Sequence, residues 1–390
     1  MVRFAWFVVL TLLTGPFVQQ DAGIPTERSS ATYDVWQWNV AGDTMHDGSV
    51  TDGLVEAAVS SIVGRGVDLA AFNELCRQQY DAVVDRLSDL AWSRDPSAFA
   101  RFAEQQGGSA SVCGGQPMGL ALFSAAPLGP AEVWTLPSDG SDQARLLLCA
   151  ALADEPGVRF CTTHITTSGD PSPRNGRPHN VNQLDTVLQR LEAYRAAGMT
   201  VVIAGDFNAQ PSYRRLDRWY SSGLDGPANR GNVGRYRELD DDDSRHCRGY
   251  GEWTAAGAPG AAPPCAGTGT RCTGAQTDGC GKIDLIFVRE DRIVGGYTGD
   301  SLDIATTCRD VPEQPDVHPA GACSDHRIVT GTVTVLTEPS DPLRHRSGGW
   351  SLSSRPSALA AATTTRWRRS ARPRRGATGV RAGRGASAFR

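Results

Sequence analysis

Short apolar, β-branched or aromatic segments alternate with helical segments between residues 33 and 336. This alternation most constrains the fold, because strands that follow one another through helices pack those helices against the faces of a sheet. It predicts an α/β domain. The expected helices are 53–64, 77–89 and 180–197. The expected strands are 33–39, 69–74, 118–124, 144–150, 159–163, 200–204, 284–288 and 328–335.

The two ends of the chain differ from this central region. Residues 1–23 hold one Arg and then an apolar run, Phe4 to Leu13, which is too short to span a bilayer and is typical of a secretory signal peptide. A buried N-terminal strand or a misassigned start codon is the alternative. We expect a catalytic domain over 30–336, with a Cys- and Gly-rich insertion at 222–281, and a disordered Arg-rich tail over 337–390.

Charge is distributed unevenly along the chain. The formal net charge is -4, but residues 344–390 contain twelve Arg and neither Asp nor Glu, so the remainder carries -16. Such a tail can bind a polyanion by releasing its counterions. A GC-rich coding sequence read past its usual end explains the same composition.

The cysteines number ten, and an even number in an exported chain favours disulfides in an oxidising compartment. Zinc is the competing interpretation, but no C-x-x-C pair occurs. A hairpin folded about Glu155 sets Cys149 opposite Cys161, within reach of a cross-strand disulfide. Cys308 with Cys323 is the next pair suggested by proximity in sequence.

Polar residues stand where several of the expected strands end, which is where open α/β sheets carry their functional groups. Glu74 ends an apolar run in AFNEL, and Asn39 ends the strand before it. A carboxylate at such a place suits Mg²⁺ or Mn²⁺, which take one or two protein carboxylates and keep several waters. A salt bridge or a helix cap is the structural alternative.

Two further stretches carry acid and imidazole groups. In VVIAGDFNAQP, Asp206 and Asn208 lie on one face of the extended chain, where they can hold a water and a phosphoryl oxygen together; an Asx turn is the alternative. Asp284 heads an apolar strand, and we pair it with His326, because a carboxylate fixes the tautomer of an imidazole and stabilises its protonated form.

The remaining candidates are His164, which ends a strand, and Asp325, which precedes His326. Arg174 and Arg177, in the polar loop after His164, are expected to contact substrate phosphates or simply to be solvated.

In this order, the stretches VWQWNV, AFNEL, TTHI, VIAGDFNAQ, KIDLIFV and SDHRIV resemble the endonuclease/exonuclease/phosphatase superfamily, which includes the pancreatic-type deoxyribonucleases. The resemblance covers about residues 33–336. It implies a four-layered α/β/β/α sandwich with two central mixed β-sheets and a site at one rim.

The resemblance also implies roles for the matched residues. Asn39, Glu74 and Asp325 bind or support Mg²⁺, with Mn²⁺ as the alternative, and Asp206 with Asn208 orients the attacking water. His164 and the His326–Asp284 pair stabilise the transition state. The carboxylate that abasic-site enzymes carry just beyond the Asn is missing, because Val40 stands there. His46, in the loop that follows, is expected to be exposed.

These features predict a secreted, metal-dependent phosphoesterase that hydrolyses phosphodiester bonds by activating water, as a deoxyribonuclease does. The alternatives are a sphingomyelinase-like phospholipase C, an inositol-polyphosphate phosphatase and a non-catalytic binding module on the same fold. Nucleic acid is the expected substrate. Nothing implies a stable protein partner, and we expect a monomer.

Overall fold

The computed structural model describes residues 29–106, 112–226, 229–242, 248–256, 280–315 and 317–338. The predicted signal peptide at 1–23 lies outside the described residues. So do the predicted tail beyond residue 338 and most of the Cys-rich part of 222–281. No helix within the described ranges is long and apolar enough to cross a membrane.

Two six-stranded mixed sheets form the centre of the fold, as the resemblance implied. The first has the order β13-β14-β1-β2-β4-β3, with bounds Ile293–Ser301, Val329–Leu336, Ser30–Asn39, Leu69–Cys76, Met118–Ser124 and Ala100–Gln106. The second has the order β5-β6-β7-β8-β12-β9, with bounds Glu132–Thr135, Leu146–Ala151, Val158–His164, Thr200–Asp206, Asp284–Arg289 and Tyr236–Glu238. A separate two-stranded pair joins β10 (Ala255–Ala256) to β11 (Cys280–Gly281).

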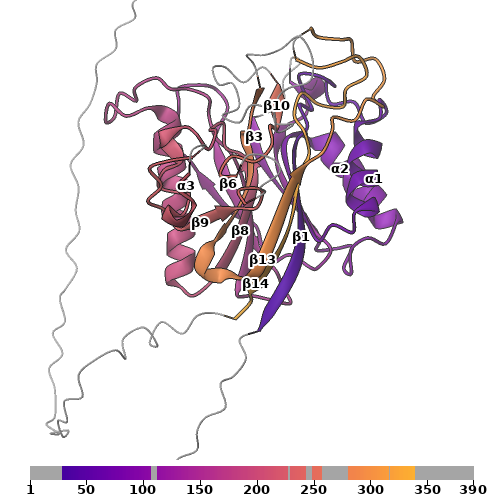
Figure 1. The fold of residues 1–390 in the computed structure, drawn as a ribbon. Helices are drawn as coiled ribbons and strands as arrows, with labels where there is room; N and C mark the ends of the chain where they lie inside the picture. Colours follow the sequence, from indigo (N-terminus) through magenta and orange to yellow (C-terminus); the bar gives the residue numbers. More distant parts are fainter. Residues whose placement is uncertain are drawn as a thin grey trace, which may run out of the picture. The chain divides into compact units, whose positions relative to one another are not determined.

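Three helices cover the outer faces of this sandwich. The helices α1 (Leu54–Gly64) and α2 (Arg77–Asp89) lie on one side of the paired sheets, and α3 (His179–Ala196) lies on the other (Figure 1). One apolar cluster fills the space between the sheets, a second packs α1 and α2 on the first sheet, and a third packs α3 on the second. The domain is therefore a four-layered α/β/β/α sandwich.

All eight expected strands and all three expected helices are present. The strands β3, β5, β9 and β13 were not predicted. All four lie at sheet edges, where one side of the strand needs no partner and the apolar pattern is weak; β13 also contains Gly295 and Gly296. The strand β9 lies within the segment 222–281 that was expected to be an insertion, and it pairs with β12 as the last strand of the second sheet.

Three disulfides link described cysteines. Cys149 and Cys161 are direct partners on the antiparallel strands β6 and β7 and are bonded, as expected from the hairpin. Cys308 is bonded to Cys323, the other pair suggested from the sequence. Cys76 is bonded to Cys113, a pairing that was not predicted.

Phe287 gives a direct test of how the second sheet holds β12 in place. Its ring lies 5.1–5.2 Å from those of Phe207, Trp219 and Tyr220, and its side chain is fully buried. We expect Phe287→Ala to lower the free energy of unfolding by roughly 3–5 kcal/mol, because it leaves a cavity. Urea unfolding measures this.

Val133→Ala serves as the control, because Val133 is largely exposed on the edge strand β5. We expect that change to stay within about 0.5 kcal/mol of the wild type. A loss below 1 kcal/mol for Phe287→Ala would show that the aromatic cluster does not support β12.

Candidate active site

The ends of five strands meet at one rim of the sandwich and carry the polar residues singled out in the sequence. Asn39 ends β1, His164 ends β7 and Asp206 ends β8. His164 pairs with Asp206 in the parallel register of β7 and β8, and Asp206 pairs with Asp284 in the antiparallel register of β8 and β12. The registers thus bring residues far apart in sequence to one place.

Asn73, a residue of β2, connects the two sheets beneath this rim. Its Nδ2 donates to the carbonyl of Thr163 at 3.2 Å and to Oγ1 of Thr162 at 3.3 Å, both on the opposite sheet. Its Oδ1 accepts the backbone N–H of Asp206 at 2.7 Å. Asn73 therefore fixes where the end of β8 lies relative to β2, which makes it a positioning residue that sequence reasoning did not identify.

Glu74 takes a backbone conformation that few residues tolerate. Its φ is +56°, and the pairing of β2 with β4 shifts register between Phe72 and Leu75. Such a bulge turns a side chain away from the regular alternation of a strand. Gly42 packs against the backbone here, and a Cβ at that position would lie 2.6 Å from the Glu74 carbonyl oxygen. The bulge accounts for Glu74 joining the site.

Asn39 lies between two of the acids. Its Nδ2 donates to Oε1 of Glu74 and to Oδ2 of Asp206, each at 3.2 Å, while its Oδ1 accepts the N–H of Ala41. Asn39 therefore holds the half-buried carboxylate of Glu74 close to the buried carboxylate of Asp206. Of the two roles implied by the resemblance, binding a metal or supporting its ligands, this orientation favours the second.

Asp206 is buried and closely bordered by other polar groups. Its Oδ1 accepts the N–H of Asn208 at 2.8 Å, and Nδ2 of Asn208 donates to the carbonyl of Ile165. Burial, followed by the charge of Asp284, raises the pKa of Asp206 to about 7. Asn208 has a φ of +46°, a conformation that Asn adopts more readily than most residues.

His326 and Asp284 form the pair expected from the sequence. Nδ1 of His326 lies 2.8 Å from Oδ2 of Asp284, which also accepts from Oγ1 of Thr254 at 2.8 Å. Burial alone lowers the pKa of His326, but the carboxylates of Asp284 and Asp325 outweigh it and hold that pKa well above its ordinary value. The imidazole is therefore a buried cation.

His164 has the opposite character. Its Nε2 lies 3.5 Å from Oδ2 of Asp206 and 3.9 Å from Oε1 of Glu74, and burial holds its pKa well below the ordinary value. Its Nδ1 is buried and has no hydrogen-bond partner within the protein. A neutral imidazole in this position can donate one hydrogen bond to an oxygen of a bound substrate.

The acids have the chemistry of a divalent-metal site. Burial raises the pKa of Glu74, and the negative charge of Asp325 raises it further. One oxygen of Asp325 is buried without a hydrogen-bond partner. Ligand atoms of Asp206, Asp284 and His326 lie within 4.8 Å of one another, but Asp284 and His326 are already bonded to each other. Glu74, Asp325 and Asp206 are therefore the carboxylates that fit a hard cation.

Arg145, just before β6, is a site residue that sequence reasoning missed. Its guanidinium lies 4.0 Å from Asp139, and Nε and Nη1 are buried without a hydrogen-bond partner. Its charge acts on Asp206 and Glu74. An arginine with open donors beside buried acids suits an anionic substrate group. Its place at the head of the apolar run RLLLCAA was the only signal in the sequence.

The polar residues that meet at the rim are called the cluster residues below: Asn39, Glu74, Arg145, His164, Asp206, Asp284, Asp325 and His326. Arg174 and Arg177 are not among them. They line a hollow of about 540 Å³ beside α3 that contains none of the cluster residues, and Arg177 is paired with Asp185 of that helix at 2.5 Å. His46, expected to be exposed, is 5% exposed instead. Its Nδ1 lies 2.6 Å from Oδ2 of Asp52, which explains its burial.

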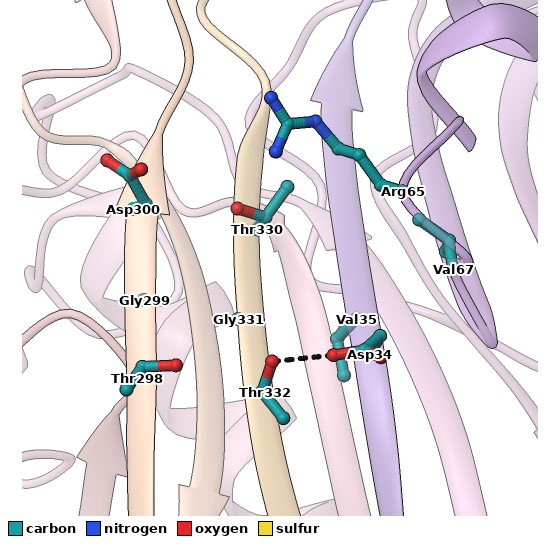
Figure 2. A pocket seen from close by; sticks show the side chains of 10 residues that line it. All are labelled: Asp34, Val35, Arg65, Val67, Thr298, Gly299, Asp300, Thr330, Gly331 and Thr332. Atoms are coloured by element: carbon teal, nitrogen blue, oxygen red, sulfur yellow. Dashed lines mark hydrogen bonds between the residues drawn. The ribbon is translucent and has the colours of Figure 1, made fainter. Parts of the chain in front are cut away.

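A further hollow of about 360 Å³ lies on the outer face of β13, β14 and β1. Figure 2 shows Arg65 reaching toward Thr330 at its edge, and the hydroxyl of Thr332 donating to Asp34 below. None of the cluster residues lines it. It is separate from the catalytic rim.

Several solved structures are similar to this chain. One is an endonuclease/exonuclease/phosphatase family protein from Bacteroides thetaiotaomicron, with 13% identity and a TM-score of 0.49, covering 79% of this chain and 99% of that one. Another is truncated TDP2 from Caenorhabditis elegans, with 14% identity and a TM-score of 0.47, covering 77% and 97%. A third is TDP2 from D. rerio complexed with a single-strand DNA product, with 18% identity and a TM-score of 0.47, covering 78% and 99%.

No curated protein sequence matches the chain. The model of the Endonuclease/Exonuclease/phosphatase family, by contrast, matches residues 36–326, a span that contains every residue of the rim described above. The chain therefore belongs to the endonuclease/exonuclease/phosphatase family and is a metal-dependent phosphoric ester hydrolase.

Proposed function

We propose that the protein is a secreted, Mg²⁺-dependent nuclease that hydrolyses phosphodiester bonds by activating water. One observation carries this proposal: the buried His326–Asp284 pair and the open guanidinium of Arg145 both border the acids that fit a metal ion. Two cations and a metal site around one small space suit the phosphoryl group of a substrate.

Asp206 is suited to accept the proton of the attacking water. A general base works best when its pKa is near the working pH, and the pKa of Asp206 is about 7. The N–H of Asn208 fixes Oδ1, and Nδ2 of Asn39 donates to Oδ2, which keeps a second lone pair for the water. Protonated His326 and Arg145 stabilise the negative charge that develops on the phosphoryl oxygens.

A bound Mg²⁺, held by Glu74 and Asp325 with Asp206 beside them, supplies Lewis-acid stabilisation of the phosphoryl oxygens and the leaving group. The protein's own hydroxyl at this place is not free to act as a nucleophile. Oγ of Ser324 donates to the carbonyl of Asn39 at 2.7 Å and accepts the N–H of His326. Direct attack by water fits this arrangement.

The sphingomyelinase alternative loses its support in the described residues. Such an enzyme needs exposed aromatic or apolar side chains to enter a membrane surface. The aromatic residues of 222–281 are Tyr236, Tyr250 and Trp253, and all three are buried. Trp253 instead packs against the guanidinium of Arg327 at 4.1 Å.

The inositol-polyphosphate alternative needs a dense basic pocket. Lys282, the only lysine of the chain, is fully buried and paired at 2.7 Å with both Glu238 and Asp240. Its ammonium group is neutralised by these two carboxylates, so it cannot bind a substrate phosphate. A non-catalytic module is disfavoured because every acid and imidazole singled out in the sequence is retained.

Secretion is part of the proposal. The apolar run at Phe4 to Leu13 and three disulfides among the described cysteines support it, because disulfides persist in oxidising compartments. The basic composition of 344–390 supports contact with a polyanion, whereas the acidity of the remainder opposes tight binding by the catalytic domain itself.

The substrate class is tested by incubating the purified protein with plasmid DNA, sphingomyelin and an inositol polyphosphate, each with Mg²⁺ and with EDTA. We expect nicking of DNA in Mg²⁺ and none in EDTA, because the metal neutralises charge that the buried acids otherwise leave uncompensated. Release of choline phosphate, or of inorganic phosphate alone, would refute the nuclease assignment.

The proposed base and cation are tested by Asp206→Asn and His326→Gln. We expect each to lower kcat by at least about 100-fold, since each removes a proton acceptor or a charge. The midpoint of thermal unfolding should change by only a few degrees. Asp81→Asn, on the surface of α2, is the control. Full activity in either variant would contradict the assigned roles.

A matched pair of variants tests whether Arg145 at the rim or Arg174 in the loop after β7 binds the substrate. We expect Arg145→Met to lower kcat/KM for DNA by roughly 100-fold, because the guanidinium beside Asp206 is lost. We expect Arg174→Met to have little effect, since Arg174 lies beside α3. Equal losses would show instead that the loop after β7 binds the substrate.

A further inference from the structure

A hollow of about 340 Å³ opens next to Asp325, at the edge of the proposed active site. One wall is the loop between β1 and α1, which contributes Thr44 and Met45. The other is the loop between β13 and β14, which contributes Val311 and Val317. Asp325 therefore borders both the hollow and the proposed active site, where its charge acts on Glu74 and His326.

The walls combine apolar surface with hydrogen-bonding edges. Met45, Val311, Pro312 and Val317 supply the apolar part. Gln314 and His318 supply polar side chains, and Nδ1 of His318 lies 3.2 Å from the carbonyl of Pro319, so its other nitrogen is left for a ligand. The hollow is thus lined about equally by apolar and polar side chains, and polar groups placed beside an apolar wall can fix the orientation of a small ligand.

The loop that forms the second wall is fixed at several points. The disulfide between Cys308 and Cys323 closes it, and Nε2 of His46 lies 3.1 Å from the carbonyl of Cys323. Gln314 and His318 exchange two backbone hydrogen bonds at 3.1 Å. These contacts hold the hollow open in the free protein, so that a ligand does not have to order the loop.

The lining selects among the groups that a phosphodiester can carry. No Arg or Lys is among the described residues that line it, which disfavours a second phosphate. No Phe, Tyr or Trp lines it either, which disfavours a quaternary ammonium group, because such groups are held by aromatic faces. A base bound here would pack on aliphatic side chains and not on an aromatic ring. The small volume and the polar side chains of Gln314 and His318 disfavour an acyl chain.

We propose that this hollow is a subsite for a nucleobase next to the scissile phosphate. The assignment rests on the proposed nuclease function and deepens it. A base has flat apolar faces, which pack against Met45, Val311 and Val317, and a polar edge, which Gln314 and His318 can hydrogen-bond. The subsite contributes affinity for nucleotides over other phosphodiesters.

The test compares three dinucleotide substrates. One carries thymine on both sugars, and the others lack the base on the 5′ or the 3′ sugar. For the wild type we expect kcat/KM to fall about tenfold when the base on one side is absent. Val317→Phe fills the hollow, and we expect it to lower kcat/KM about tenfold for the complete dinucleotide while leaving that for the matching abasic dinucleotide unchanged.

Val233→Phe is the matched control, because Val233 is 71% exposed and does not line the hollow. Gln314→Ala, an exposed change with little risk to folding, is expected to lower kcat/KM for the complete dinucleotide about threefold. Equal kcat/KM of the wild type for complete and abasic dinucleotides would overturn the subsite. So would an equal effect of Val317→Phe on both substrates. Failure to cut any nucleic acid would instead overturn the nuclease function on which the subsite rests.

Discussion

The side-chain amide of Asn73 connects the two sheets at the point where the catalytic rim begins, and the geometry of the rim depends on it. It donates to the end of β7 and accepts from the end of β8, so it fixes both strands relative to β2. The next residue, Glu74, leaves the regular strand through a bulge. Asn73 and Glu74 are adjacent in sequence. Asn73 therefore fixes how the two sheets lie relative to each other at the rim, and Glu74 places a carboxylate there. An apolar residue at position 73 would leave the N–H of Asp206 without its partner in a buried place, which is costly.

Many hydrogen bonds at the rim are made to charged side chains, because charged groups removed from water need polar partners. Glu74 is half-buried and Asp206 is buried, the pKa values of both carboxyl groups are raised, and Asn39 donates to both. The cations around them, His326 and Arg145, only partly balance their charge. Positive φ values at Glu74 and Asn208 add local strain. A folded protein tolerates uncompensated charge and backbone strain where function requires them. A metal ion bound by these carboxylates would add the compensating positive charge and stabilise the folded state.

The fold was largely predictable, because the core strands and helices of this chain carry clear apolar periods. The edge strands β3, β5, β9 and β13 were not, since an edge needs only one partner and few buried side chains. The site residues at strand ends were predictable for a related reason. An apolar run that stops at Asn39, Glu74 or Asp206 indicates that the strand ends there, at the rim of a sheet. Arg145 and Asn73 were missed, because their roles arise from strand register between distant segments. Arg174 and Arg177 were expected either to contact substrate phosphates or to be solvated, and no local pattern indicated that Asp185 would bind Arg177.

Strands and loops contribute different parts of the proposed site, and this difference matters for substrate specificity. Strand ends position the groups that act on a phosphate, and their geometry is set by registers that tolerate little change. The hollow beside Asp325 is built differently, from two loops held by the Cys308–Cys323 disulfide and by His46. Loops accept substitutions at lower cost to stability than paired strands. The burial of His46, contrary to expectation, is thus informative: its contacts with Asp52 and the carbonyl of Cys323 tie one loop to the other, so that the wall facing the substrate is as well fixed as the rim beside it.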